Sequence, residues 1–142
     1  MTVEGEVRGQ VDRGFLVLLG VTHEDTAGTC DAVARKVVNL RVFEDDDGKM
    51  NRSLADVDGA VLCISQFTLY GDVRRGNRPS FTGAALPAEA DELYQRFCNV
   101  IRDAGIACEK GVFGAHMEVA LVNDGPVTIL VDSDELKKPR DA

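Results

Sequence analysis

Two stretches of the chain have the three- and four-residue apolar spacing of an amphipathic helix. The first lies between residues 26 and 40, and the second lies between residues 93 and 104. The second stretch follows Pro87 and ends at Gly105, residues typical of the first turn and of the end of a helix. The pattern predicts two main helices, each with one buried face. The apolar positions are Cys30, Val33, Ala34, Val37 and Val38 in the first helix and Leu93, Phe97, Val100, Ile101 and Ala104 in the second.

Short apolar or alternating runs elsewhere predict about seven strands. The run from Phe15 to Val21 is apolar on both faces, so we expect it to be a central buried strand. Strands and helices do not alternate strictly, which favours an α+β fold with a mostly antiparallel sheet or open barrel and two main helices on one side. The other predicted strands flank a turn at Glu4–Gly5 and span residues 40–43, 60–70, 106–112, 117–123 and 127–132.

The length of 142 residues allows one domain. We expect its core to span residues 1–132. Residues 133–142 are charged and have no core pattern, so they are predicted to be a flexible tail. No apolar run approaches the roughly 20 residues of a membrane helix. The acidic start of the chain does not resemble a secretory signal, so we expect a cytoplasmic protein.

Metal-binding patterns are absent from the sequence. The four cysteines form no Cys-x-x-Cys pair, and there are only two histidines, His23 and His116. In a reducing compartment such cysteines are free core residues. The acidic run from Asp45 to Asp47 lacks the spacing and closing glutamate of a calcium-binding loop. We therefore expect neither a metal nor a cofactor.

The net charge of −8 argues against a protein that binds nucleic acid by bulk electrostatics alone. It leaves room for a local basic patch, and Arg74, Arg75 and Arg78 form one within five residues. Such a cluster either contacts RNA phosphates or is a solvated loop, and the sequence leaves both interpretations open.

Candidate catalytic residues stand where an apolar strand runs into a polar loop, at Ser65, Gln66, Phe67 and Thr68. Ser65 and Thr68 face opposite sides of a regular strand unless a bend intervenes. The chain has no Gly-x-Ser-x-Gly motif, and its two histidines offer few bases, which disfavours a Ser-His triad. The alternative is that one hydroxyl caps the strand end and the other is solvated.

Two further segments could bind a ligand. The Gly125–Pro126 turn can adopt unusual backbone angles and a cis peptide bond, and its carbonyls could then receive an ammonium or an amide. A plain hairpin turn is the alternative. Phe113 and Met117 could stack on a nucleic-acid base, or they could pack in the core.

Four strings of residues, in order and at matching spacing, resemble the D-aminoacyl-tRNA deacylases. The resemblance extends from about Val3 to Asp132, which is nearly the whole chain. Together the strings are far more specific than any one of them. They are residues 65–72 (SQFTLYGD), 78–81 (RPSF), 113–117 (FGAHM, matched at the first three and the last) and 123–128 (NDGPVT).

The resemblance implies a cytoplasmic homodimer that hydrolyses the ester between a D-amino acid and the terminal adenosine of tRNA. It also implies acceptance of glycine, including glycine mischarged on tRNA(Ala), and rejection of L-aminoacyl esters. In such a protein a cis Gly125–Pro126 turn would capture the α-amino group and leave no room for an L side chain. Phe113 and Met117 would hold the adenine.

The resemblance further implies that Ser65 to Leu69 form the catalytic wall and that Ser65, Gln66, Phe67 and Thr68 are its catalytic residues. Phe67 would act through its backbone amide, and Thr68 matches a residue whose role as a nucleophile is disputed. Because the ribose 2′-hydroxyl can help to position water, no side-chain base is then required. If the arginine cluster has a role in such a protein, phosphate contact is the usual use of clustered arginine.

Members of the resembled family begin further upstream, with an additional strand. We therefore expect that the translation start of this chain lies upstream of Met1. If the chain is truly this short, the alternative function is a non-catalytic dimer that binds RNA ends or a nucleotide. A third hypothesis, an unrelated small-ester hydrolase that uses Ser65, is the least favoured.

Overall fold

A three-stranded parallel sheet forms the centre of the computed structural model, which describes residues 1–138. Its strands are β3 (Gly14–Leu19), β6 (Ala60–Ser65) and β7 (Cys108–Lys110), in the order β3-β6-β7. The pairing of β3 with β6 runs without a break from Gly14 opposite Ala60 to Leu19 opposite Ser65. Because the strands are parallel, the carboxyl ends of β3 and β6 meet at one edge of the sheet.

Two long helices connect these strands, and both confirm the predicted helices. Helix α1 (Ala27–Asn39) begins after Thr26, whose side chain accepts a hydrogen bond from the backbone of Thr29 in a reciprocal capping box. Helix α2 (Pro87–Asp103) has proline in its first turn, where a backbone N–H is not needed. The chain thus runs β3–α1–β6 and β6–α2–β7, the connection that parallel strands require.

The remaining elements are short. Strands β1 and β2 form an antiparallel hairpin at the N-terminus, and β4 and β5 form a second one after α1. A 3₁₀ helix, η1, follows β6, and helix α3 lies against α1. Their bounds are Thr2–Val3 (β1), Glu6–Val7 (β2), Phe43–Glu44 (β4), Met50–Arg52 (β5), Phe67–Tyr70 (η1) and Ser133–Lys137 (α3).

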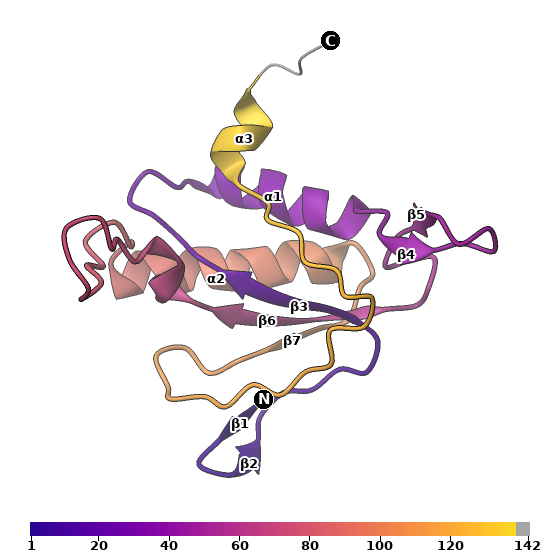
Figure 1. Ribbon diagram of the computed structural model, residues 1–142, viewed down its shortest axis with the longest axis horizontal. Coiled ribbons are helices and arrows are strands. Elements are labelled where there is room, and N and C mark those ends of the chain that lie inside the picture. Colours follow the sequence, from indigo (N-terminus) through magenta and orange to yellow (C-terminus); the bar gives the residue numbers. More distant parts are fainter. Residues whose placement is uncertain (139–142) are drawn as a thin grey trace.

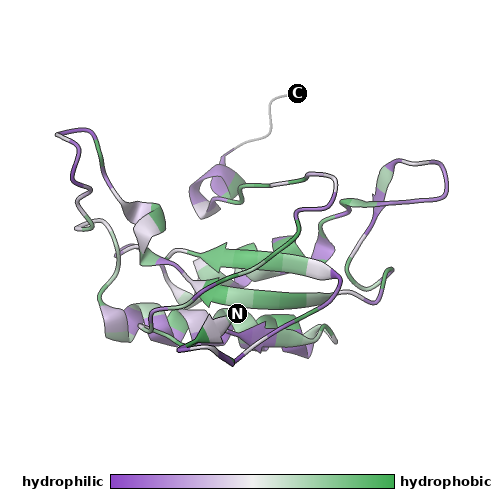
Figure 2. Ribbon diagram, turned by 60° about the horizontal axis from the view of Figure 1, so that its bottom comes forward, coloured by the Kyte–Doolittle hydropathy of each residue, from purple (hydrophilic) through white to green (hydrophobic). Residues whose placement is uncertain are grey.

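Alternate residues of β6 face two different apolar layers. Val61 and Cys63 are buried with side chains of α1 and α2. Leu62 and Ile64 pack on the opposite face, against the N-terminal hairpin and residues 112–119. Figure 1 shows the helices on one side of the sheet and the N-terminal hairpin on the other, and Figure 2 shows that the central strands are hydrophobic. The two-residue period of a strand places the core on both faces of β6.

The prediction of a mostly antiparallel sheet or open barrel was wrong for the central sheet. In the described residues the central sheet is parallel, the antiparallel pairs are two-stranded, and no barrel closes. The order of strand and helix along the chain already contained the β-α-β signal. The hairpin β4–β5, inserted between α1 and β6, disguised it. The α+β class with two main helices is confirmed.

The strand expected at the centre of the sheet lies at one side of it. β3 is half-buried along most of its length and pairs with β6 alone among the named strands. β6 is the central strand, and four of its six residues are buried. The apolar run on both faces of β3 therefore predicted a strand with both faces packed against other residues. It did not predict whether the strand lies at the centre or at the side of the sheet.

The strands predicted at residues 117–123 and 127–132 are absent from residues 1–138, apart from one bridge between Thr2 and Glu118. A strand needs a partner for its backbone hydrogen bonds, and an apolar pattern alone does not supply one. Leu121, Val122 and Leu130 are exposed instead. Part of the predicted tail, Ser133–Lys137, is helical, and residues 139–142 lie outside the described residues.

The four cysteines are free, as predicted: Cys63, Cys98 and Cys108 are buried, and Cys30 is half-buried. Within residues 1–138 no helix is long and apolar enough to cross a membrane. The same part of the chain contains no group of three His, Cys, Asp or Glu side chains that could hold a metal ion. Asp45 instead closes its own turn, since its carboxylate accepts the backbone N–H groups of Asp47 and Lys49.

Candidate active site

The hydroxyl and amide side chains at residues 65–68 lie where β6 ends and η1 begins. Ser65 is the last residue of β6, and the backbone N–H of Gln66 donates to the carbonyl of Leu19 at 2.8 Å. Phe67 then starts η1, so the strand alternation stops before Thr68. Ser65 and Gln66 are half-buried, whereas Phe67 and Thr68 are exposed. The structure thus brings the four predicted catalytic residues to the carboxyl edge of the sheet.

Gly20 allows η1 to pack against the end of β3. A Cβ at this position would lie 3.1 Å from both Leu69 Cβ and Tyr70 Cε2. This contact is tighter than ordinary van der Waals packing. The absence of a side chain at Gly20 therefore lets Leu69 and Tyr70 of η1 pack against the end of β3.

The hydroxyl of Thr68 is bonded to an amide. Gln66 Nε2 donates a hydrogen bond to Thr68 Oγ1. Within residues 1–138 neither histidine forms a hydrogen bond with Ser65 or Thr68, and His23 Nε2 lies 2.7 Å from the carbonyl of Thr82. The geometry contains no nucleophile–base–carboxylate relay in this part of the chain.

A second wall begins at Gly111, directly after β7. A Cβ at Gly111 would stand 2.9 Å from Met117 Sδ, so the thioether lies directly over the glycine. Met117 packs in the cluster that contains Ile64. Phe113 lies on the helix side, with its ring centroid 6.3 Å from that of Tyr94. The two residues predicted to hold a base are both half-buried near the end of β6, but they belong to different apolar clusters.

The arginine loop lies beyond η1 and is tied by Asp72. The carboxylate of Asp72 accepts hydrogen bonds from Arg74, including Arg74 Nη2 at 2.7 Å and Arg74 Nε at 2.9 Å. These bonds lower the pKa of Asp72 to about 2. Ser80 pairs with Asp72 across the loop. Asp72, Arg74 and Ser80 line a surface depression together with the exposed side chains of Arg75 and Arg78.

The Gly125–Pro126 turn is held by Asn123. Asn123 Oδ1 accepts the backbone N–H of Val127, and Asn123 Nδ2 donates to Thr128 Oγ1, both at 3.1 Å. The Gly125–Pro126 peptide bond is cis, and Gly125 has a φ of 145°. Both residues are exposed. In the described part of the chain no hydrogen bond joins this turn to residues 65–68.

Sequence reasoning missed two residues that organise this region. Tyr94 was not included in the apolar stripe of the second helix, yet it is 1% exposed. A tyrosine on such a stripe is a usable signal, because its buried hydroxyl requires a partner. Asp72 was not recognised as the partner of Arg74, although the two are only two residues apart in a loop.

These features define a small α+β protein whose candidate site lies at the carboxyl edge of a parallel sheet. Within residues 1–138 its hydroxyl groups have no histidine partner. It is flanked by the segment 111–117, whose aromatic and thioether side chains pack in different apolar clusters, and by the arginine loop. The family described as D-Tyr-tRNA(Tyr) deacylase matches residues 1–132. The chain belongs to this family of hydrolases, which confirms the resemblance stated above.

Relatives of known name agree with the family. The chain is 59% identical over 135 residues to a D-aminoacyl-tRNA deacylase from Thermus aquaticus, covering 95% of this chain and 89% of the relative. It is 58% identical over 132 residues to the protein of the same name from Exiguobacterium sibiricum, with 93% and 91% covered.

Two solved structures are similar to this one. A protein called c-Myc DNA Unwinding Element Binding Protein superposes with a TM-score of 0.83 at 42% identity, covering 90% of this chain and 87% of that one. A probable eukaryotic D-amino acid tRNA deacylase gives a TM-score of 0.56 at 17% identity, with 71% and 74% covered. The second likeness concerns the fold alone.

Proposed function

We propose that this protein hydrolyses the ester bond of D-aminoacyl-tRNA in the cytoplasm, releasing the free D-amino acid and tRNA. The family match over residues 1–132 carries this proposal. The chirality of the amino acid decides the outcome: D-aminoacyl and glycyl esters, including glycine mischarged on tRNA(Ala), are substrates, and L-aminoacyl esters are not.

We propose that Ser65, Gln66, Phe67 and Thr68 form the wall against which the ester lies. Phe67 stands at the first position of η1, where a backbone N–H has no intrahelical partner. This N–H is suited to stabilise the oxyanion that develops at the ester carbonyl. The ester is already activated, and the neighbouring ribose 2′-hydroxyl helps to position water. The chemistry therefore needs orientation and an oxyanion donor more than a side-chain base.

The adenine of the terminal nucleotide is assigned to the wall that contains Phe113 and Met117. Both side chains are half-buried, so each keeps an exposed surface on which a base could stack. Met117 packs against Ile64, the residue before Ser65. A base held there would place its ribose ester beside the end of β6.

The Gly125–Pro126 turn is proposed to select chirality. Its backbone carbonyls would accept the α-ammonium group, and its rigid backbone would occupy the space of an L side chain. An apolar pocket distinguishes similar side chains weakly, whereas direct overlap with a backbone rejects one enantiomer completely. Glycine has no side chain to exclude, so its acceptance follows from the same geometry.

We propose that the protein acts as a homodimer. The segment around the turn exposes large apolar side chains, with Val122 90% exposed and Leu130 88% exposed. Exposed apolar patches of this kind favour a protein interface. We propose that the second copy covers this exposed apolar segment.

Arg74, Arg75 and Arg78 are proposed to contact tRNA phosphates. Arg75 and Arg78 are exposed in the loop that follows η1. This loop returns to the site at Phe81, whose ring centroid is 5.0 Å from that of Phe67. With a net charge of −8, the protein should bind tRNA modestly and lose affinity as salt rises.

The test is hydrolysis of D-tyrosyl-tRNA beside L-tyrosyl-tRNA by the purified chain, followed as release of labelled tyrosine. We expect release from the D-ester alone. Equal release from both esters would refute chirality selection. Binding of the tRNA without release would instead support the alternative function, a non-catalytic dimer that binds RNA ends.

A further inference from the structure

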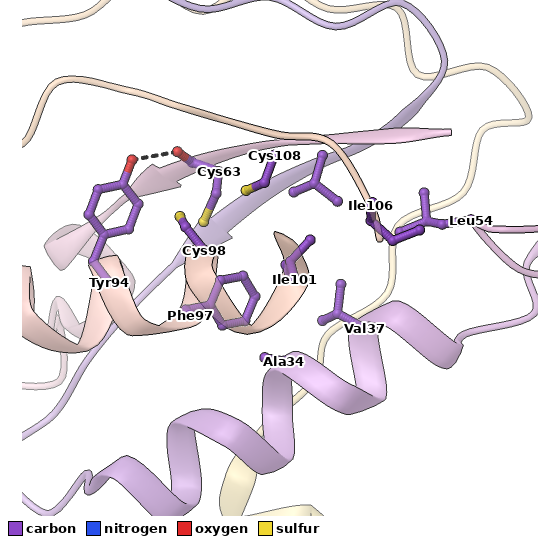
Figure 3. Close-up of a cluster of buried hydrophobic side chains, with 11 residues drawn as sticks. Ala34, Val37, Leu54, Cys63, Tyr94, Phe97, Cys98, Ile101, Ile106 and Cys108 are labelled. Atoms are coloured by element: carbon purple, nitrogen blue, oxygen red, sulfur yellow. Dashed lines mark hydrogen bonds between the residues drawn. The ribbon is translucent and has the colours of Figure 1, made fainter. Parts of the chain in front are cut away.

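Tyr94 of α2 connects the two walls of the candidate site through its hydroxyl. The side chain is 1% exposed, and its hydroxyl donates to the carbonyl of Cys63 at 2.6 Å (Figure 3). The same hydroxyl accepts the backbone N–H of Gly111 at 3.0 Å. A buried tyrosine hydroxyl with both a donor and an acceptor partner is fully satisfied.

These two partners stand where β6 and β7 separate. The pairing of the strands ends with Cys63 opposite Lys110. Beyond this point β6 continues for two residues to Ser65. The segment that follows β7 continues through Gly111 to Phe113. The Tyr94 hydroxyl therefore lies at the fork from which both walls diverge.

Tyr94 is connected to both residues assigned to the adenine, to Phe113 through its ring and to Met117 through Gly111. Its ring centroid is 6.3 Å from that of Phe113. Gly111, which it holds through the hydroxyl, lies directly beneath Met117 Sδ. One side chain thus supports the aromatic and the thioether parts of this wall.

We propose that Tyr94 is a positioning residue that fixes the wall of Phe113 and Met117 relative to the catalytic wall. The inference rests on the proposed function, because it names the residue that would hold the adenine wall in place. Burial raises the pKa of Tyr94 above its usual range, so the hydroxyl remains a donor at all physiological pH values.

The hydroxyl is separable from the fold. The Gly111 N–H also donates to the carbonyl of Cys63 at 3.0 Å, so this backbone group keeps a partner when the hydroxyl is removed. Tyr94→Phe retains the ring that packs in the core. The expected loss is in the placement of the adenine wall, and the effect should appear in nucleotide binding.

The experiment compares Tyr94→Phe with Ile101→Val, which removes one methylene from the same buried face of α2. Ile101 is fully buried and forms none of these hydrogen bonds, so this variant controls for a general loosening of the core. Three quantities are measured: the affinity for adenosine 5′-monophosphate, KM and kcat for D-tyrosyl-tRNA, and the exchange of the Gly111 amide hydrogen.

For Tyr94→Phe, which loses both hydrogen bonds of the hydroxyl, we expect about tenfold weaker nucleotide binding and an equal rise in KM. We expect kcat to change less than about twofold, because the hydroxyl does not touch the ester. Exchange of the Gly111 amide should accelerate. Ile101→Val should leave all three near wild type. Gly111→Ala, whose Cβ would displace Met117, should raise KM in the same way.

The inference is overturned if Tyr94→Phe binds the nucleotide as wild type does, or if Ile101→Val reproduces its effect. It is also overturned if kcat falls while KM stays constant, since the hydroxyl would then act on the ester wall. Failure of the proposed function gives a different outcome from these three results. In that case wild type would release no tyrosine, while nucleotide binding would still fall in Tyr94→Phe.

Discussion

The side-chain amide of Gln66 donates a hydrogen bond to the hydroxyl of Thr68. A hydroxyl becomes a nucleophile when a neighbouring base takes its proton. An amide N–H group only donates, so it cannot accept this proton. In the observed geometry Gln66 orients Thr68 without activating it, and Thr68 is suited to a binding or orienting role.

We therefore expect Thr68→Ala to keep kcat for D-tyrosyl-tRNA within about tenfold of wild type, as for the loss of a single hydrogen bond. Single-turnover kinetics with saturating enzyme separate this chemical step from binding. Thr68→Val, which keeps the shape and lacks the hydroxyl, is the matched control. Near-complete loss of turnover in both variants, with folding and tRNA binding intact, would restore a covalent role for Thr68.

Gly125→Ala should reduce hydrolysis of the D-ester by about tenfold or more, because an L residue forced into an unfavourable backbone conformation costs on the order of 1–3 kcal/mol. Gly125 has a φ of 145°, and a Cβ there would stand 2.9 Å from Val127 Cγ2. The turn would shift to relieve this contact and would move its carbonyls. The measurement is kcat/KM for D-tyrosyl-tRNA and for glycyl-tRNA, and both should fall.

Gly48→Ala is the control for backbone strain alone. Gly48 also has a positive φ, of 75°, and a Cβ there would meet nothing within 4 Å. It lies in the turn between β4 and β5, among residues not assigned to the site. We expect a small decrease in thermal stability and unchanged turnover. Equal turnover in the two variants would remove the Gly125–Pro126 turn from the proposed mechanism.

Asp72→Asn should strengthen tRNA binding and make it more sensitive to salt. The Asp72 carboxylate engages Arg74, and its removal frees a cation for a phosphate. One additional phosphate contact steepens the plot of log affinity against log salt by about 0.7 to 0.9. Hydrogen bonds from Arg74 hold the pKa of Asp72 at about 2, so the carboxylate is ionised at pH 5.5 and at pH 8. The increase should therefore be the same at both pH values.

Arg75→Gln gives the opposite change, weaker binding with a shallower salt dependence. Arg35→Gln is the matched control, since Arg35 is an exposed arginine on α1 with Asp31 as its ion-pair partner. Filter binding from 50 to 300 mM KCl measures all three variants. The assignment of the arginine loop would be rejected if Arg35→Gln lowered affinity as much as Arg75→Gln.

Local patterns predicted the helices correctly because the signals for a helix lie within the helix itself. Thr26 caps α1 and Pro87 occupies the first turn of α2, at the positions where the sequence placed these boundaries. The strand segment of β6 was also found, although the sequence did not show where η1 would end it. Each of these elements is decided by neighbours within a few residues.

Strand pairing and the placement of the site depended on contacts between distant residues. The alternation of residues 117–123 is that of a strand, but the partner that would complete a ladder is absent from the described residues. The link from Tyr94 to Cys63 and Gly111 joins α2, β6 and the segment after β7, and no spacing rule reveals it. The strings of the resembled family located residues 65–68 and 113–117, while the structure supplied the fork between them.

The stability of the fold should decrease above pH 9 through Cys30. Burial of Cys30 is the main cause that raises the pKa of the Cys30 thiol from 9.0 to about 11, and the negative charge of Asp31 adds to it. The thiol therefore ionises more easily in the unfolded chain than in the fold, and its contribution is complete below pH 9 and is lost as the pH rises towards 11. Cys30→Ser is the sharp comparison, because a hydroxyl can still donate to the carbonyl of Leu93 but does not titrate in this range. Urea unfolding at pH 7, 8, 9 and 10 should give a smaller decrease for Cys30→Ser than for wild type. Identical pH dependences would show that Cys30 is not the titrating group.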